Sequence, residues 1–399
     1  MSPAFTFIHT SDWHLGLSVY GRDCRIRQEA MLARLAEVVA DRRPDAVIVS
    51  GDIYDSAQPP VWATRLLVEG LAAVRRAGPE GMRIIVIAGN HDSAARHEAM
   101  SPLWAFAGID MIGRIDRPAG EAPQADAFAE ANARLVIHIP GKAYVVAVPY
   151  AHDRNIPDGF YPAMLAAARR NAREDLPVVM AAHCAVASDP AGEAVGGIDV
   201  RPLEAMGSGY DYLALGHIHR PASFALPGSP AIARYCGSPL AVSFDERFRH
   251  TFSLVSLSGH GPDARVNVEK ITVNDPCPLV NIPAEGFAAW DDCLAELNAF
   301  PASRPCLLRI NVLVDDFLHP EARDEAAAAL EGKAAALCVI NSRRADPAEG
   351  ASSADDSMTV AEFRDTPPFD LAARYAADTA ADFSPELMEL FREIESSIE

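Results

Sequence analysis

The chain has 399 residues, 49% of them hydrophobic and 23% charged, which is typical of a globular protein with two or three domains. No apolar run approaches the roughly 18 residues of a membrane span, and no basic stretch followed by a long apolar one opens the sequence. We therefore expect a cytoplasmic protein with neither a transmembrane helix nor a signal peptide. The net charge of −20 argues against a chain that holds nucleic acid by bulk electrostatics alone.

The first predicted strand, Phe5 to Ile8, leads into a short polar segment that contains Asp12 and His14. A carboxylate and an imidazole two residues apart on a turn can bind one divalent cation. Alone, this pair has little specificity, because such pairs occur by chance in most chains and usually mark a solvated turn.

The next two predicted strands end in the same way. Residues 46–49 form an apolar run that ends before Asp52, and residues 84–87 form one that ends before Asn90 and His91. Apolar residues at helical spacing fill the intervening segments, 28–42 and 61–76. Polar side chains at the ends of strands that alternate with helices predict an α/β layered fold with the site at one edge of the sheet.

From about residue 108 the pattern becomes rich in strands. One apolar run, 178–182, ends at His183, and another, 212–215, ends before His217 and His219. Further strands are predicted at 135–139, 144–148, 231–236 and 251–257. We expect two sheets packed face to face with helices outside, closing near residue 274.

The polar residues at these strand ends form a consistent set of metal ligands. They are Asp12, His14, Asp52, Asn90, His183, His217 and His219. Such a set, with a shared carboxylate, could hold two divalent ions that orient a phosphoryl group and activate a water. Imidazole, amide and carboxylate ligands without thiolate suit manganese or a similar first-row ion better than calcium or a structural zinc.

The domain organisation follows from changes in the pattern along the chain. We expect a first domain that carries the site over 1–274, a small α+β capping domain over 275–345, a flexible acidic linker over 346–357 and a helical tail over 358–399. Leu387, Leu390, Phe391 and Ile394 form an apolar stripe on the tail, which predicts a partner-binding surface.

The order of the motifs resembles that of the calcineurin-like metallophosphoesterases. The matching segments are 12–14 (Asp-Trp-His), 51–55 (Gly-Asp-Ile-Tyr-Asp), 89–92 (Gly-Asn-His-Asp), His183 and 216–219 (Gly-His-Ile-His). Within that superfamily the chain is similar to the nuclease subunits of bacterial SbcCD-type DNA-repair complexes. The closer match rests on segments 11–16, 216–220, 234–239 and 243–246, the last of which has no physical explanation from sequence.

The resemblance implies a role for each motif residue. Asp12, His14 and His219 would hold one manganese ion, Asn90, His183 and His217 would hold the other, and Asp52 would bridge them. His91 is similar to the catalytic histidine that contacts the scissile phosphate or the leaving group. Asp55 lies where related phosphatases keep an aspartate beside that histidine, and a carboxylate partner would favour its imidazolium form.

The function that this resemblance implies is a two-metal phosphodiester hydrolase, with residues 1–274 as the nuclease domain. It would act as a double-strand exonuclease and a single-strand and hairpin endonuclease in DNA repair, recombination and replication, near the nucleoid, with an SbcC-like SMC-type ATPase as its partner. Two alternatives stay open: a metallophosphoesterase acting on phosphoproteins or on cyclic or small nucleotides, and a catalytically silent DNA-end scaffold. A module of more than 100 residues after the first domain, which a small-molecule phosphodiesterase does not need, favours the nuclease.

The resemblance also implies a homodimer within a heterotetramer. An apolar stripe on the predicted helix 61–76 (Leu66, Leu67, Leu71 and Val74) and the apolar segment 100–106 could pair across a two-fold axis. Periodicity alone equally allows both segments to cover the sheet of their own chain.

Overall fold

The computed structural model describes residues 4–118, 124–152, 155–172, 175–187, 200–226 and 229–344. The chain divides into two compact units, Met1–Arg343 and Arg344–Glu399. The predicted linker (346–357) and tail (358–399) lie outside the described residues, so both stay predictions.

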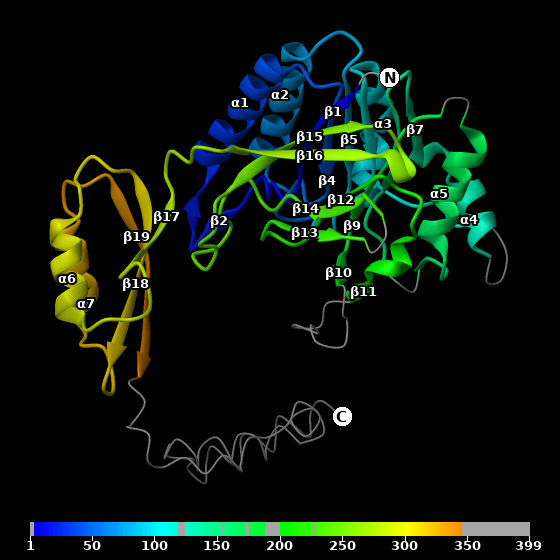
Figure 1. Ribbon diagram of the computed structural model, residues 1–399. Coiled ribbons are helices and arrows are strands. Elements are labelled where there is room, and N and C mark those ends of the chain that lie inside the picture. The colour runs from blue at the N-terminus through cyan, green and yellow to red at the C-terminus, as the bar shows by residue number, and fades with distance from the viewer. Residues whose placement is uncertain are drawn as a thin grey trace, which may run out of the picture. The chain divides into compact units, whose positions relative to one another are not determined.

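The first sheet has six strands (Figure 1). β1, β4, β5 and β6 pair in parallel, β15 pairs antiparallel with β1, and β16 pairs antiparallel with β15. In spatial order they are β16 (Arg265–Thr272), β15 (Thr251–Ser258), β1 (Phe5–Thr10), β4 (Ala46–Ser50), β5 (Arg83–Ile87) and β6 (Ile109–Ile112). Crossover helices connect the parallel strands: α1 (Arg25–Arg42), α2 (Val61–Ala77) and α3 (Ala94–Phe106).

The second sheet also has six strands, with a parallel centre and one antiparallel strand at each edge. In spatial order they are β13 (Ala222–Ala225), β14 (Ile232–Tyr235), β12 (Tyr212–Gly216), β9 (Val178–His183), β8 (Ala143–Val148) and β7 (Val136–Ile139). Two helices, α4 (Ala125–Ala131) and α5 (Phe160–Asn171), pack together outside it. Small ladders and 3-10 turns complete the domain: β2 (Ser18–Val19) with β3 (Arg22–Asp23), β10 (Ala185–Ala187) with β11 (Val200–Pro202), η1 (Ala133–Leu135), η4 (Leu203–Met206) and η5 (Gly261–Asp263).

The two sheets share one apolar core. Phe7 and Ile85 of the first sheet and Met180 and Leu213 of the second belong to the same buried cluster, which also takes in residues of α4 and α5. Burial of this surface contributes roughly 25 cal/mol per Å². The other face of the first sheet packs against α1 and α2, which lie side by side in Figure 1. The predicted two-sheet sandwich flanked by helices is therefore confirmed.

The apolar stripe of α2 faces its own sheet. Leu67, Leu71 and Val74 are buried in the cluster that covers the first sheet, and Leu66 packs against it. Leu67, Leu71 and Val74 are therefore not exposed for pairing across a symmetry axis, because they are already covered within the chain. The exposed apolar side chains in this region are different ones: Val61, Val68, Met100, Leu103 and Phe106.

The segment after Asp275 forms a separate three-stranded sheet with its own core. The order of elements is β17 (Leu279–Ile282), α6 (Trp290–Ala299), β18 (Cys306–Val314), α7 (Ala322–Ala329) and β19 (Ala335–Arg344). Ile282, Leu297, Ile310 and Ala326 are fully buried members of that core. We call this part the second domain; its strands and helices match the small α+β unit expected from sequence.

Strand ends position the site. The carboxyl ends of β1, β4 and β5 lie next to one another because these strands are adjacent and parallel. In the second sheet, Gly216 at the end of β12 pairs with His183 at the end of β9. Since β4 contacts both β9 and β12, the loops of both sheets meet at one edge of the sandwich.

Candidate metal centre

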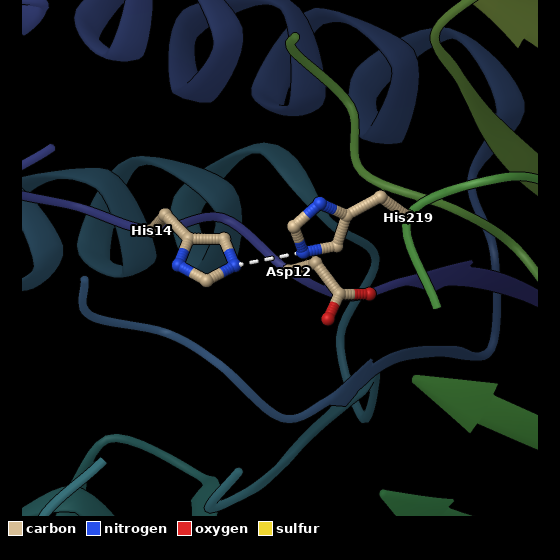
Figure 2. A group of neighbouring side chains, drawn as sticks. All are labelled: Asp12, His14 and His219. Atoms are coloured by element: carbon tan, nitrogen blue, oxygen red, sulfur yellow. Dashed lines mark hydrogen bonds between the residues drawn. The ribbon is translucent and has the colours of Figure 1, made fainter. Parts of the chain in front are cut away.

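The first cluster consists of Asp12, His14 and His219. Asp12 and His14 follow β1, and His219 follows β12 in the other sheet. Figure 2 shows the Nε2 atoms of the two imidazole rings directed toward each other beside the carboxylate, and these atoms are 3.1 Å apart. Asp12 and His14 are almost completely buried.

The second cluster consists of Asn90, His183 and His217. The Oδ1 atom of Asn90 lies 3.0 Å from Nε2 of His183 and 2.9 Å from Nδ1 of His217. His183 is the last residue of β9, whereas Asn90 follows β5 and is exposed. The Nδ1 atom of His183 donates a hydrogen bond to the Ser50 carbonyl (2.7 Å), which leaves the lone pair of its Nε2 directed to the cluster.

Asp52 connects the two clusters. Its Oδ2 atom lies 3.3 Å from Nε2 of His183 and 3.9 Å from Nε2 of His14. Its Oδ1 atom accepts a hydrogen bond from the backbone N–H of His91 (2.9 Å). The carboxylate therefore lies near ligands of both clusters.

The backbone of the site is strained. Among the described residues, only six non-glycine residues have a positive φ, and four of them are candidate ligands: Asp12 (55°), His14 (45°), Asp52 (50°) and His217 (97°). Each such residue typically costs about 1 to 3 kcal/mol, and strain of this kind concentrates at functional sites. Hydrogen bonds between loops maintain it, because Asp12 N–H donates to the Gly51 carbonyl and His14 N–H to that of Asp52.

Glycine at two positions allows the loops to approach each other. A Cβ atom on Gly89 would overlap the Asp52 carboxylate, and one on Gly51 would overlap the His183 ring. Gly51 also has a φ of 90°, which favours glycine. These residues thus let ligand loops of different strands pack directly on one another.

The charges of the site perturb its titrating groups. Burial alone would lower the pKa of His183, but the carboxylate of Asp52 outweighs it and raises that pKa to about 9. Although burial disfavours its charged form, the neighbouring imidazoles of His183 and His14 hold the pKa of Asp52 well below its usual range. Burial and the charge of His183 lower the pKa of His217 to about 4. Cations and protons would therefore compete for this buried site.

His91 lies beside the first cluster, exposed at the rim. Its ring is 4.9 Å from that of His14, and its Nδ1 atom is 2.8 Å from the backbone carbonyl oxygen of Asp55. The Asp55 carboxylate instead lies 3.4 Å from Nδ1 of His14. The sequence predicted the Asp55 carboxylate as the partner of His91, but the partner is the backbone carbonyl of Asp55. The loop after β4 directs the Asp55 side chain toward the first cluster instead.

Asp92 orders the loops around the ligands. Its carboxylate accepts hydrogen bonds from the backbone N–H groups of Gly89 (2.8 Å), Ile53 (3.1 Å) and Tyr54 (2.9 Å). It thereby joins the loops after β4 and β5. From sequence, Asp92 belonged to a motif but had no role of its own, because the three N–H groups come from two separate loops.

Glu246 supports His219. Its Oε1 atom accepts a hydrogen bond from Nδ1 of His219 (2.7 Å), and its Oε2 atom accepts bonds from the Ser238 hydroxyl and the Val242 N–H (both 3.2 Å). Burial alone would lower the pKa of His219, but this bond and Asp12 raise it. A carboxylate behind a ligating histidine fixes its tautomer and orientation. This gives segment 243–246 the physical role that sequence left open.

The residues present fit two divalent ions. Ligand atoms about 2.1 Å from an ion and at right angles to each other lie about 3 Å apart. The separations within the two clusters, 3.1 Å in the first and 2.9 to 3.0 Å in the second, match that spacing. Two imidazole nitrogens that point toward each other need a cation or a proton between them. This set of donor atoms therefore suits a bound metal ion.

The family is shown by comparison with known proteins. Residues 5–221 match the sequence pattern described as calcineurin-like phosphoesterase, which covers both sheets up to the loop of His217 and His219. The chain belongs to this family.

Comparison with curated proteins narrows the class further. The chain is 32% identical to SbcD, a component of the nuclease SbcCD, from Bacillus subtilis, over 68% of the chain and 71% of that protein. It is 29% identical to SbcD of Rhodobacter capsulatus, over 73% of the chain and 75% of that protein, and 26% identical to SbcD of Escherichia coli K12, over 78% and 79%. Within the family the chain is thus a nuclease of the SbcD type, a phosphodiester-hydrolysing enzyme of DNA repair.

A more distant relative has the same general role. The DNA double-strand break repair protein Mre11 of Methanopyrus kandleri is 26% identical over 61% of the chain and 51% of that protein.

In the described residues, no helix combines the length and apolar character needed to cross a membrane.

Proposed function

We propose that the chain is a manganese-dependent nuclease that degrades duplex DNA from its ends, cuts single strands and hairpins, and works with an SbcC-like ATPase in DNA repair and recombination. The observation that carries this proposal is the convergence of the two clusters on Asp52, with His91 exposed beside them. The names of the relatives supply the substrate class.

The assignment of ligands follows the geometry. Asp12, His14 and His219 would hold one ion, Asn90, His183 and His217 the other, and Asp52 would serve both. Bound divalent ions would orient a phosphodiester, lower the pKa of a water and neutralise the charge of in-line displacement. Histidine, amide and carboxylate donors without thiolate favour manganese.

His91 is the proposed proton donor. Because a carbonyl oxygen only accepts, Nδ1 of His91 carries a hydrogen that it donates to Asp55, and a second proton would be held at Nε2. From the exposed rim of the site, Nε2–H would donate to a phosphoryl oxygen or to the leaving oxygen. Asp55 would act on the first cluster through His14, from which its carboxylate is 3.4 Å away.

One assay tests the core of the proposal. Purified protein should degrade a linear DNA duplex in the presence of Mn²⁺ and lose this activity in a chelator. The co-expressed ATPase should stimulate it in the presence of ATP. Preference for a phosphopeptide or a cyclic nucleotide over DNA would replace the proposal with the alternative phosphoesterase.

The tail is the proposed ATPase-binding segment. Two features support this role. The tail carries an apolar stripe, and a chain with a net charge of −20 needs a partner in order to bind DNA. Deletion of 358–399 should preserve Mn²⁺-dependent cleavage of short single strands and abolish ATP-stimulated duplex degradation. Co-purification of the truncated chain with full ATPase occupancy would contradict this role.

A second copy of the chain is proposed to cover α3. Leu103 is 61% exposed and Phe106 is 91% exposed, and Val68 of α2 and Met100 line a pocket next to them. Charged substitutions Leu103→Glu and Phe106→Glu should convert a dimer to a monomer in light scattering at micromolar concentration. Phe317→Glu, an exposed aromatic of the second domain, is the matched control and should change nothing.

A further inference from the structure

Arg309 extends from the second domain to the first. It lies on β18 with only 9% of its surface exposed. Its Nη2 atom donates to the Asp245 carboxylate (2.6 Å), and its Nε atom donates to Oδ1 of Asn281 on β17 (2.8 Å). The guanidinium group also lies over the Phe244 ring, 5.3 Å from its centroid.

Asn281 holds the same loop by its backbone. Its Nδ2 atom donates to the Phe244 carbonyl (2.8 Å), so residues 244 and 245 are both bound by the second domain. At the other end of the loop, Nη2 of the buried Arg27 donates to the Ala241 carbonyl (2.9 Å). Segment 241–245 is therefore fixed at both ends.

Glu246 is the next residue along this loop. It forms the hydrogen bond to Nδ1 of His219, and Nε2 of the same ring faces His14 in the first cluster. An unbroken series of contacts thus runs from Arg309 through the loop and Glu246 to a candidate ligand. A displacement of the loop would move the Glu246 carboxylate and with it the His219 ring.

These contacts do more than hold the two domains together. An apolar cluster that includes Val19, Cys24 and Leu307 already joins them, and Arg27 binds Asp275 with 2.8 Å between Nη2 and Oδ2. Arg309 and Asn281 instead bind the two residues that precede Glu246. A buried arginine with several directed hydrogen bonds is suited to fixing an orientation.

We propose that Arg309 and Asn281 are positioning residues for His219, acting through loop 241–246 and Glu246. The second domain thereby determines the manganese affinity of the first cluster and leaves the second cluster unaffected. This inference rests on the proposed two-metal function, because it concerns how one ligand of that centre is oriented.

The test measures Mn²⁺ binding to the full chain without substrate, with bound ions counted by paramagnetic resonance. Arg309→Ala and Asn281→Ala should each weaken binding of one ion by about tenfold, within the range of about 10 to 100 that loss of an outer-shell partner costs. The other ion should bind as in the wild type. Arg309→Lys, which keeps the positive charge but lacks the planar guanidinium group, should retain part of the Mn²⁺ affinity.

A matched control and a double variant separate positioning from general damage. Arg304→Ala removes another second-domain arginine that lies over a phenylalanine ring, Phe300, and should leave both affinities unchanged. Adding Arg309→Ala to Glu246→Gln should cause no further loss, because both act through one carboxylate. Unfolding temperatures in a chelator identify any variant that does not fold.

Each outcome decides a different point. If a folded Arg309→Ala or Asn281→Ala variant binds both ions with wild-type affinity, the positioning role is wrong. If Arg309→Ala does not fold, Asn281→Ala alone decides. If the wild type binds no Mn²⁺, the proposed function fails.

Discussion

The first and second clusters use similar ligands but are supported by different parts of the molecule. In the second cluster, Nδ1 of His183 donates to the backbone carbonyl of Ser50, and the ring is fully buried. In the first cluster, Nδ1 of His219 donates to the Glu246 side chain, on a loop that the second domain holds.

This difference determines how each cluster can be changed. A backbone carbonyl at the end of a central strand cannot be removed by substitution and moves only if the sheet moves. A glutamate on a loop can be lost, and it moves with the residues that hold it. The second cluster is thus a fixed part of the fold, whereas the first is open to adjustment through the loop that Arg309 and Asn281 hold.

Asp52→Asn should have the largest effect, because Asp52 is shared by both clusters. The substitution keeps the shape and the Oδ1 acceptor for His91 but removes the negative charge. We expect Mn²⁺-dependent duplex degradation to fall by more than about 10³, with fewer bound ions. Asp41→Asn, exposed on α1, is the control. Near wild-type cleavage by Asp52→Asn would show that the clusters work without a shared carboxylate.

His91→Gln should separate catalysis from metal binding. The ring lies exposed at the rim and is not among the seven proposed ligands, so both ions should still bind. Proton donation of this kind contributes about 10² or more in rate, and single-turnover cleavage should fall by that factor. Loss of a bound ion, seen by anomalous scattering, would instead make His91 a ligand.

Paired substitutions behind the two clusters test their difference directly. Glu246→Gln should weaken Mn²⁺ binding by about 10- to 100-fold, because the carboxylate behind His219 is lost. Ser50→Ala should change it by less than about threefold, because the carbonyl that accepts from His183 remains. Calorimetric titration measures the Mn²⁺ affinity of both variants. Equal losses of affinity would contradict the difference between the two clusters.

A buried histidine beneath the site should affect stability rather than activity. His9 on β1 is fully buried with Nδ1 3.0 Å from the Tyr212 hydroxyl, and burial and the charge of Arg234 lower its pKa to about 3. Since its unfolded pKa is about 6.5, the unfolded state binds more protons between these values, and stability falls as pH falls.

His9 should lower the free energy of unfolding by about 3 kcal/mol when the pH falls from 6.5 to 4. Denaturant titrations at both pH values should show a smaller loss for His9→Gln than for the wild type. The exposed His152→Gln is the control. Parallel pH profiles for the wild type and His9→Gln would mean that His9 does not titrate on unfolding.

The sequence could predict the elements and the main site residues because both depend on local pattern. Apolar runs of four to six residues identified the central strands, and Asp12, Asp52 and Asn90 followed directly from where those runs end. Parallel strands then require their carboxyl ends to share one edge. The seven predicted ligands do meet there, although their binding of metal is still a proposal.

Several features could not be read from the sequence, because they depend on contacts between distant segments. The partner of His91 is a carbonyl because of a turn that propensities do not specify, and the stripe of α2 faces its own sheet because β4 and β5 lie beneath it. Glu246 reaches His219 across 27 residues of sequence, and Arg309 reaches Asp245 across 64. The sequence by itself thus determined which residues end the strands and carry the ligands, since strand and turn signals are local. Only the tertiary structure decided which side chains orient those ligands, because that depends on which loops the packed sheets and the second domain bring together.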